Sequence, residues 1–447
     1  MDKNSGSLFF AVAILSAFML TCVMTGKAQA QSVSIATWQN NAKGAYSMIM
    51  DDFPGSWTPG IEQIADTMLA NRGLAVSIAT IVTHCTSAKW QVARDMVSRG
   101  HRIECHSWNH LQSWGPTEFA KEVDSALAAI DRNVPNQKCL FYAFPYDSYD
   151  DVKVNYLRTK GILGCRSGGW GANPNPYNLS DPFRPKYQVF GTAEGLSGLN
   201  SFVSSAVSQG GWALRETHGV QDASWNPVPI DTFRAHLDFC RQEIDNGNLW
   251  MAPAQTVLKY IYERKNYAVS VQNANVSQFE ILFQGNAMDS SIYDLPLTLL
   301  VKLPVNYDSV EVVQGGTILN IVRLNPDSIM FNANPFRGII AVQNAGSSHT
   351  SDQISLMKDA GIKIWPNPVS GKANVILLNT NREAPFFDLN IYDIRGRMVY
   401  TSSSIQHSAS GIWDGRDNFG NQMGCGSYIV ELRNGSDCFR GNITFIK

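Results

Sequence analysis

The stretch Ala45-Tyr-Ser-Met-Ile-Met-Asp51-Asp52 decides the fold, because an uncharged, mostly apolar run ends in two adjacent acids. A run of this kind is typical of a strand that is buried in a sheet. The stretch His101-Arg-Ile-Glu-Cys105 is interpreted as a second strand, and it leads directly into His106. Both stretches therefore predict that chemically reactive side chains follow the C-terminal end of a strand.

Helices and strands alternate on both sides of these two strands. Thr58-Pro59 is predicted to begin a helix that ends at Gly73, because proline suits the first helical position and glycine the position past the end. The other predicted helices are 87–99, 117–132, 150–160, 230–246 and 253–265, and the other predicted strands are 74–82, 139–144, 162–165, 212–217 and 249–251. Parallel strands need helical crossovers, so this alternation predicts an α/β fold, a distorted (β/α) barrel.

The residues of chemical interest fall just after predicted strands, at the edge where barrel enzymes gather their catalytic groups. They are Asp51, Asp52, His106, Pro145 and His218. His106 and His110 are four residues apart and can face one ion, and a carboxylate from another strand gives a three-ligand metal site with an open position for water. Each of these features also has a non-functional explanation. The histidine spacing can arise by chance, adjacent acids often only form a turn, and His218 alone is more typical of a structural histidine.

Five motifs occur in order along this part of the chain. They are Met50-Asp-Asp52, Gly100-His-Arg-Ile-Glu-Cys-His-Ser-Trp-Asn-His110, Phe144-Pro-Tyr146, Glu216-Thr-His-Gly219, and Trp250-Met-Ala-Pro-Ala254 with Tyr260-Ile-Tyr-Glu-Arg264. The ordered set resembles the polysaccharide deacetylases of carbohydrate esterase family 4, which share the NodB homology domain. The resemblance covers about residues 45–265, and it is specific as a set although no single motif is.

The resemblance implies a divalent metal ion, with zinc as the expected ion, held by Asp52, His106 and His110. Such an ion lowers the pKa of a bound water from about 16 towards about 7 and polarises a carbonyl group. Hydrolysis of an amide or ester at neutral pH requires both effects. The implied chemistry is therefore removal of N- or O-linked acetyl groups from an extracellular acetylated polysaccharide or oligosaccharide.

The resemblance also implies three catalytic roles. Asp51 would act as the general base, the backbone N–H of Tyr146 would help to hold the tetrahedral oxyanion, and His218 would act as the general acid. The family often has an arginine three residues before the tyrosine, where it orients the base, but this chain has Ala143. Arg166 or another cation could replace it. The alternative function is a non-catalytic glycan-binding protein that retains the deacetylase fold.

The loops around the predicted site have two further distinctive features. The family's first motif usually continues with Gly-Pro, whereas Phe53-Pro54-Gly55 follows here, so the loop over the metal is expected to differ. Several tryptophans lie in or near the strand-end loops, where their rings either stack on sugars or pack in the core. They are Trp57, Trp108, Trp114, Trp170 and Trp225. His84, His101 and His236 are interpreted as structural or surface residues.

Both ends of the chain predict export. Residues 1–30 are interpreted as a signal peptide, because Lys3 precedes an apolar run and Ala28-Gln-Ala30 has the small-residue spacing of a cleavage site. At the other end, four stretches resemble the C-terminal sorting domain of type IX secretion cargo. They are Ile364-Trp-Pro-Asn-Pro-Val-Ser-Gly371, Tyr392-Asp-Ile-Arg-Gly-Arg397, Trp413-Asp-Gly415 and Gly426-Ser-Tyr-Ile-Val-Glu-Leu432. This implies the outer-membrane type IX secretion machinery as a partner, and a secreted or surface-attached protein.

The predicted layout has four parts after the signal peptide. Residues 31–267 form the deacetylase domain, 268–346 an accessory β-domain, 347–361 a linker and 362–447 the sorting domain. The last domain has short alternating strands between turn residues, which predict a sandwich. The accessory domain has strand-like runs at 295–303, 310–313 and 318–322 without clustered histidines or acids. A packing or spacing module is therefore favoured there over a carbohydrate-binding one.

Composition excludes few functions. The formal net charge of the 447 residues is -2, which gives no electrostatic reason to expect nucleic acid or an anionic membrane as a partner. Of the eight cysteines, Cys22 lies in the predicted signal peptide, so seven remain and at least one is unpaired within the monomer. A bridge between Cys425 and Cys438 on neighbouring strands is one hypothesis, but the sequence determines neither the pairing nor the oligomeric state.

Overall fold

The computed structural model describes residues 31–173, 179, 181–275, 277–304, 307, 309–344, 361–365, 373–378, 386–393, 397–406, 411–434 and 437–445. The predicted signal peptide and residues 347–360 of the predicted linker lie outside the described residues.

Within the described ranges, no helix is both long and apolar enough to cross a membrane.

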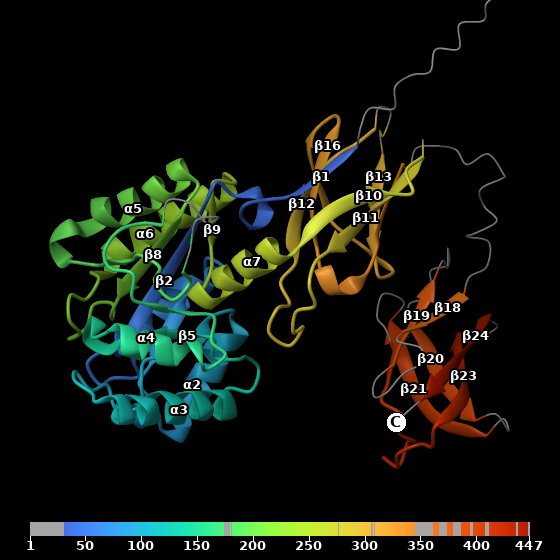
Figure 1. The fold of residues 1–447 in the computed structure, drawn as a ribbon, viewed down its shortest axis with the longest axis horizontal. Coiled ribbons are helices and arrows are strands. Elements are labelled where there is room, and N and C mark those ends of the chain that lie inside the picture. The colour runs from blue at the N-terminus through green and yellow to red at the C-terminus, as the bar shows by residue number, and fades with distance from the viewer. Residues whose placement is uncertain are drawn as a thin grey trace, which may run out of the picture.

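A parallel sheet forms the centre of the first domain (Figure 1). Its strands are β2 (Gly44–Phe53), β3 (Ser77–Thr80), β4 (Arg102–Cys105), β5 (Phe141–Ala143), β6 (Gly164–Arg166), β7 (Gln188–Val189), β8 (Trp212–Thr217) and β9 (Leu249–Met251). The strand order is β6-β5-β4-β3-β2-β8-β7, and β9 also pairs with β2. The predicted α/β barrel class is confirmed, as a half-barrel with β6 and β7 at the two ends of the described order.

Strand β2 holds the sheet together. All its residues are buried, and it pairs with β3, β8 and β9. This position explains its mostly apolar sequence up to Met50, because each large apolar side chain that is buried stabilises the fold by roughly 1.5–3 kcal/mol. The strand continues to Phe53, so Asp51 and Asp52 lie within its last residues and not, as the sequence predicted, after its end. In the parallel register Met50 lies opposite both Ile78 and Thr217, so the acids after Met50 emerge level with the end of β8.

The helices of this domain match the predicted ones with two exceptions. They are α2 (Ser87–Ser98), α3 (Pro116–Asn133), α4 (Asp151–Arg158), α5 (Gly195–Gln209), α6 (Ile230–Asp245) and α7 (Ala254–Asn266). The helix predicted at 58–73 is instead a π-helical turn, Ile61–Ala65, followed by the short α1 (Asp66–Ala70). Helix α5 was not predicted, because glycine and serine have low helix propensity. Its buried stripe of Leu199, Phe202, Val203 and Ala206 has helical spacing and was the available signal.

The first described strand, β1 (Ser32–Ile35), lies outside the parallel sheet. It pairs antiparallel with β12 (Leu297–Lys302) in the middle domain, opposite Lys302 to Leu299. The predicted domain limit at residue 31 therefore does not hold for this strand, whose alternating side chains suit the edge of an antiparallel sheet.

The middle domain consists of two antiparallel sheets, of order β1-β12-β16-β15 and β10-β11-β17-β13-β14. Besides β1 and β12, its strands are β10 (Ala268–Gln272), β11 (Gln278–Gln284), β13 (Val310–Gln314), β14 (Thr317–Ile318), β15 (Ile321–Asn325), β16 (Ser328–Ala333) and β17 (Ile340–Asn344). Buried side chains of both sheets, including Phe279, Val312 and Phe331, form one core. Leu297 also packs into the core beneath the parallel sheet, so the middle domain is joined to the first domain by buried apolar contacts.

The C-terminal part is all β. Its strands are β18 (Gly361–Trp365), β19 (Ala373–Leu378), β20 (Phe386–Asp393), β21 (Met398–Gln406), β22 (Gly411–Trp413), β23 (Gly426–Asn434) and β24 (Asp437–Phe445). They form sheets of order β18-β19-β22 and β21-β20-β23-β24. Leu389, Trp413 and Val430 lie in the core of this part.

The hypothesis of a Cys425–Cys438 bridge is wrong. Cys425 is a free, exposed thiol. In the β23–β24 register, Gly426 lies opposite Phe445 and Arg433 lies opposite Cys438. The two cysteines are therefore at opposite ends of the strand pair, roughly 26 Å apart for eight residues at about 3.3 Å per residue. A disulfide requires Cα atoms within about 7 Å of each other.

Candidate active site

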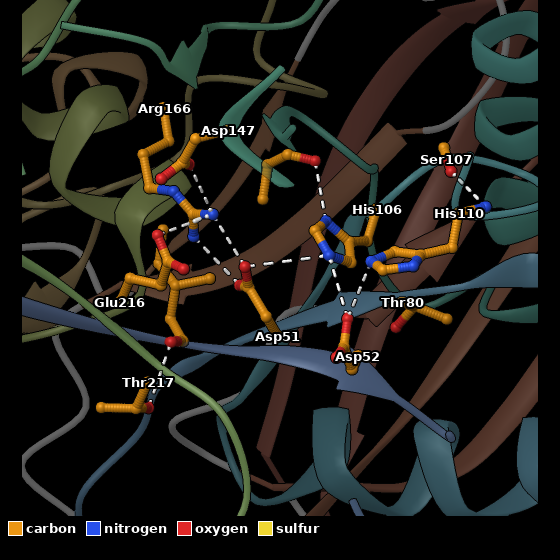
Figure 2. A network of polar contacts seen from close by, with 12 residues as sticks. Asp51, Asp52, Thr80, His106, Ser107, His110, Asp147, Arg166, Glu216 and Thr217 are labelled. Atoms are coloured by element: carbon orange, nitrogen blue, oxygen red, sulfur yellow. Dashed lines mark hydrogen bonds and ion pairs between the residues drawn. The ribbon is translucent and has the colours of Figure 1, made fainter. Parts of the chain in front are cut away.

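Three of the predicted site residues converge on one point (Figure 2). Nε2 of His106 lies 3.2 Å from Oδ1 of Asp52, and Nε2 of His110 lies 3.0 Å from the same oxygen. The nitrogen and oxygen atoms of this trio are close enough together to hold one metal ion. Oδ1 of Asp52 is buried and has no hydrogen-bond donor among the described residues. A buried carboxylate oxygen without a donor, faced by two imidazole nitrogens, is the arrangement that a cation would satisfy.

Backbone contacts orient the two histidines. Nδ1 of His106 lies 2.9 Å from the carbonyl oxygen of Ala143, which can only accept a hydrogen bond. Nδ1 must therefore carry a proton, which leaves Nε2 of a neutral ring free to bind a metal. The backbone N–H of His110 donates to Oγ of Ser107 over 2.8 Å, which fixes the turn between the two histidines.

Left-handed backbone conformations are concentrated at this site. Of the ten described non-glycine residues with positive φ, five belong to its loops. They are Asp52, Ser107, His110, Tyr146 and Asp147. Such conformations cost of order 1–3 kcal/mol each and persist where the surrounding structure enforces them, which is most common at functional sites.

Asp51 lies between Arg166 and His106, beside Asp52, and pairs with Arg166 (Figure 2). The guanidinium donates two hydrogen bonds to its carboxylate, from Nη1 to Oδ1 over 3.0 Å and from Nη2 to Oδ2 over 2.7 Å. Oδ2 of Asp51 also lies 3.8 Å from Nε2 of His106. Two parallel charge-assisted hydrogen bonds fix both the position and the orientation of the carboxylate.

The position of Arg166 explains how the chain tolerates Ala143. The two residues are register partners on the neighbouring strands β5 and β6. An arginine at 166 therefore reaches the site from the same level of the sheet as one at 143, but one strand further along. Although this chain has Ala143 where the family often has arginine, Asp51 still has a cationic partner, Arg166.

Arg166 also faces two more acids, Glu216 and Asp147. Its Nη2 lies 2.9 Å from Oε2 of Glu216 and 3.2 Å from Oδ1 of Asp147. Burial raises the pKa of Asp51, but the charges of Arg166 and His106 outweigh burial and hold it below its ordinary value. Burial raises the pKa of Glu216 well above its ordinary value, and Arg166 offsets only part of this effect. Of Asp51 and Glu216, Asp51 is therefore the ionised carboxylate.

His218 follows β8 and lies close to Asp51 and Glu216. Asp51, Glu216 and His218 bring ligand-type atoms within 4.8 Å of one another. Burial lowers the pKa of His218, and the charge of Asp51 opposes this only in part, so the ring rests neutral at neutral pH. The indole of Trp225, which is 61% exposed, packs edge-on against it with the ring centroids 5.4 Å apart.

Tyr146 contacts the other part of the site. Its ring is 60% exposed and its centroid is 4.7 Å from that of His110. Exposed aromatic rings thus lie against both His110 and His218. Flat apolar rings of this kind suit stacking on a sugar.

The remaining predicted residues divide as follows. Trp114 is buried in the core, and Trp108 is partly buried and packs against that core. Trp170 is 75% exposed. His101 and His236 are buried and hydrogen-bonded within the fold, as the structural interpretation expects. Glu216 and Asp147 were missed as partners of Arg166. Their nearness depends on strand register, and the position of Glu216 two residues before His218 on β8 was the only sequence signal.

We expect Arg166→Met to destabilise the fold by about 3–5 kcal/mol, because it leaves buried carboxylates without their cation. Arg241→Met is the matched control. Its partner Asp245 lies one helical turn away on the exposed face of α6, and such pairs contribute about 0.3–0.5 kcal/mol. Urea unfolding followed by circular dichroism measures both. Equal small effects would show that the Arg166 cluster adds nothing to stability.

Comparison with known proteins identifies two parts of the chain. Residues 39–164 match the polysaccharide deacetylase family, and residues 363–440 match the secretion system C-terminal sorting domain. The chain thus carries a polysaccharide deacetylase domain in its first part and a secretion sorting domain at its other end. The matched ranges include Asp51, Asp52, His106, His110 and Tyr146, but not Arg166 or His218.

Solved structures with a similar chain path include two family 4 carbohydrate esterases. The Xyl-CE4 domain of a multidomain xylanase, from the hindgut metagenome of Trinervitermes trinervoides, is 13% identical, with 48% of this chain and 90% of that chain covered and a TM-score of 0.34. The Streptomyces lividans esterase is 15% identical, with 47% and 92% covered and a TM-score of 0.33. A family 4 pseudoenzyme from Bacillus anthracis is 13% identical, with 49% and 66% covered and a TM-score of 0.34.

Among curated proteins, a gellan lyase from a Bacillus species is 21% identical over 335 residues. The match covers 69% of this chain but only 13% of that protein. The chain therefore spans about an eighth of the length of this relative.

Proposed function

We propose that this protein is a secreted, metal-dependent deacetylase that removes acetyl groups from an extracellular polysaccharide. The proposal rests on one observation, that a candidate metal site and an ionised carboxylate lie next to each other. Asp52, His106 and His110 face one point, and the ionised Asp51 is held beside them by Arg166. A metal site next to a positioned base is what hydrolysis of an acetyl amide or ester requires.

The donor set favours zinc. Two imidazole nitrogens and one carboxylate oxygen are a common catalytic zinc set, which keeps one coordination position open. When bound, the metal supplies a more acidic water and a polarised carbonyl group. Asp52, His106 and His110 would hold it.

The chain's own groups would move the protons and bind the developing charge. Asp51 accepts a proton from the attacking water, because its carboxylate is ionised and fixed by Arg166. The backbone N–H of Tyr146, presented by the left-handed turn after β5, donates to the oxyanion. His218 rests neutral, so it acts as an acid only after it has received a proton, which it then gives to the departing amine or alkoxide.

The substrate is an acetylated polysaccharide or oligosaccharide. Support comes from the family match and from the exposed rings of Tyr146 and Trp225, which lie against His110 and His218. N-acetyl and O-acetyl groups require the same machinery, so both remain candidate bonds. The alternative function, non-catalytic glycan binding, was motivated by Ala143. It loses that support, because Arg166 provides the cation that Ala143 lacks.

The test is acetate release by the purified mature chain from acetylated xylan, chitin oligomers and peptidoglycan. We expect release from at least one of these substrates and none from their deacetylated forms. Binding to a glycan without acetate release from any of them would support the glycan-binding alternative instead.

We further propose that residues 1–30 direct the chain across the inner membrane and that the sorting domain engages the outer-membrane type IX machinery. A chain of Gln31 to Gly346 keeps β1 and β17 of the middle domain, so it should fold and retain its activity in vitro. With the signal peptide retained, the same truncation should accumulate in the periplasm of the native host, measured by cell fractionation. Equal surface display of both forms would rule out the sorting role.

A further inference from the structure

The loop after Asp52 folds back over that residue. The backbone N–H of Gly55 donates to the carbonyl oxygen of Asp52 over 2.6 Å, and Oγ1 of Thr58 donates to the same oxygen over 2.9 Å. Between these two contacts, Nε1 of Trp57 donates to Oδ2 of the Asp52 side chain over 2.8 Å. Both carboxylate oxygens of Asp52 thus have distinct surroundings. Oδ2 accepts from an indole, whereas Oδ1 faces the two histidines.

Gly55 makes room for the indole. A Cβ atom at this position would lie 2.8 Å from Cε2 of Trp57 and 2.8 Å from the carbonyl oxygen of Asp52. Real Cβ atoms do not approach other atoms so closely, so the loop geometry requires glycine here. The sequence Phe53-Pro54-Gly55, where the chain departs from the family's usual Gly-Pro, is therefore the segment that delivers Trp57 to Asp52.

A second contact supports the indole from behind. Its ring packs edge-on against that of His84, with the centroids 5.4 Å apart and the planes at 83°. His84 belongs to the turn after β3, and the neighbouring backbone N–H of Thr83 donates to the carbonyl oxygen of Trp108 over 3.0 Å. Trp57 thus packs against the turn that contains His84. That turn is hydrogen-bonded to Trp108, which lies between His106 and His110.

We propose that Trp57 is a positioning residue that makes Asp52 a one-oxygen metal ligand. The indole N–H fixes Oδ2 and prevents the carboxylate from turning both oxygens to the ion, so only Oδ1 coordinates. Hydrogen bonds to a ligand's second polar atom typically change metal affinity by about 10- to 100-fold. This inference rests on the metal site of the proposed function, but metal binding can be measured without any substrate.

The experiment is zinc titration of the apo protein by competition with a chromophoric chelator. Trp57→Phe keeps a ring of similar shape but removes the donor, and we expect its zinc dissociation constant to rise by about 10- to 100-fold. Its apo thermal midpoint should stay close to that of the wild type. Acetate release by the variant should recover as zinc is raised. Trp170→Phe changes an exposed tryptophan on a different loop, the one after β6, and is the control that should bind zinc as the wild type does.

Gly55→Ala is the second variant, because it displaces the indole while Trp57 remains, and it should weaken zinc binding in the same direction. Unchanged zinc affinity in Trp57→Phe, or an equal loss in Trp170→Phe, would overturn the role of Trp57. Failure of the wild-type protein itself to bind zinc would instead contradict the metal site on which the proposed function rests.

Discussion

His106→Ala is expected to abolish metal binding and acetate release together. In the proposed site His106 would supply one of three ligand atoms, and its ring also lies between Asp52 and the carbonyl of Ala143. The fold should survive, because the ligand lies after the end of β4, on a sheet whose core is formed by other residues. Elemental analysis of the purified variant measures the metal content, and far-ultraviolet circular dichroism measures the fold.

Asp51→Asn is the matched comparison for His106→Ala, because Asp51 is next to the proposed ligand Asp52 on β2 but is not itself a proposed ligand. It should keep the metal that His106→Ala loses. Full metal occupancy in His106→Ala would remove this histidine from the ligand set.

The same Asp51→Asn variant carries the second large prediction, on the rate. We expect acetate release to fall by roughly 10² to 10⁴, the range for loss of a positioned proton-transfer group. The amide is nearly the same size as the carboxylate but cannot accept the proton. Steady-state rates at saturating zinc measure the effect.

Asp147→Asn is the control for Asp51→Asn, because Asp147 also faces Arg166 but lies further from the metal ligands. Its rate should fall much less. Loss of the metal in Asp51→Asn, with the metal retained in Asp52→Asn, would mean that the two acids have exchanged roles.

The parallel sheet was predictable from the sequence for a physical reason. Strands such as β2 are buried throughout, so most of their residues are apolar, and the first charged residue of β2 comes within three residues of its end. Because the carboxyl ends of parallel strands meet at one edge, the strand ends also predicted that Asp52 and His106 would lie close together.

Features that depend on register or on contacts across the chain were not predictable. Nothing local shows that Ser32 to Ile35 pairs with a strand more than 260 residues later. The partnership of Arg166 and Asp51 was only one possibility, because it requires the β5–β6 register to be known. Trp57 was expected either to stack on sugars or to pack in the core, whereas its indole N–H bonds to Asp52.

The central claim is that acetate release depends on a metal held by Asp52, His106 and His110. The most direct measurement is acetate release by chelator-treated mature protein, on the substrate that the wild type cleaves, as zinc is added back. We predict no release from the apo protein and full recovery at one equivalent of zinc, with no recovery for His106→Ala. Undiminished release by protein shown to be free of metal would contradict the account.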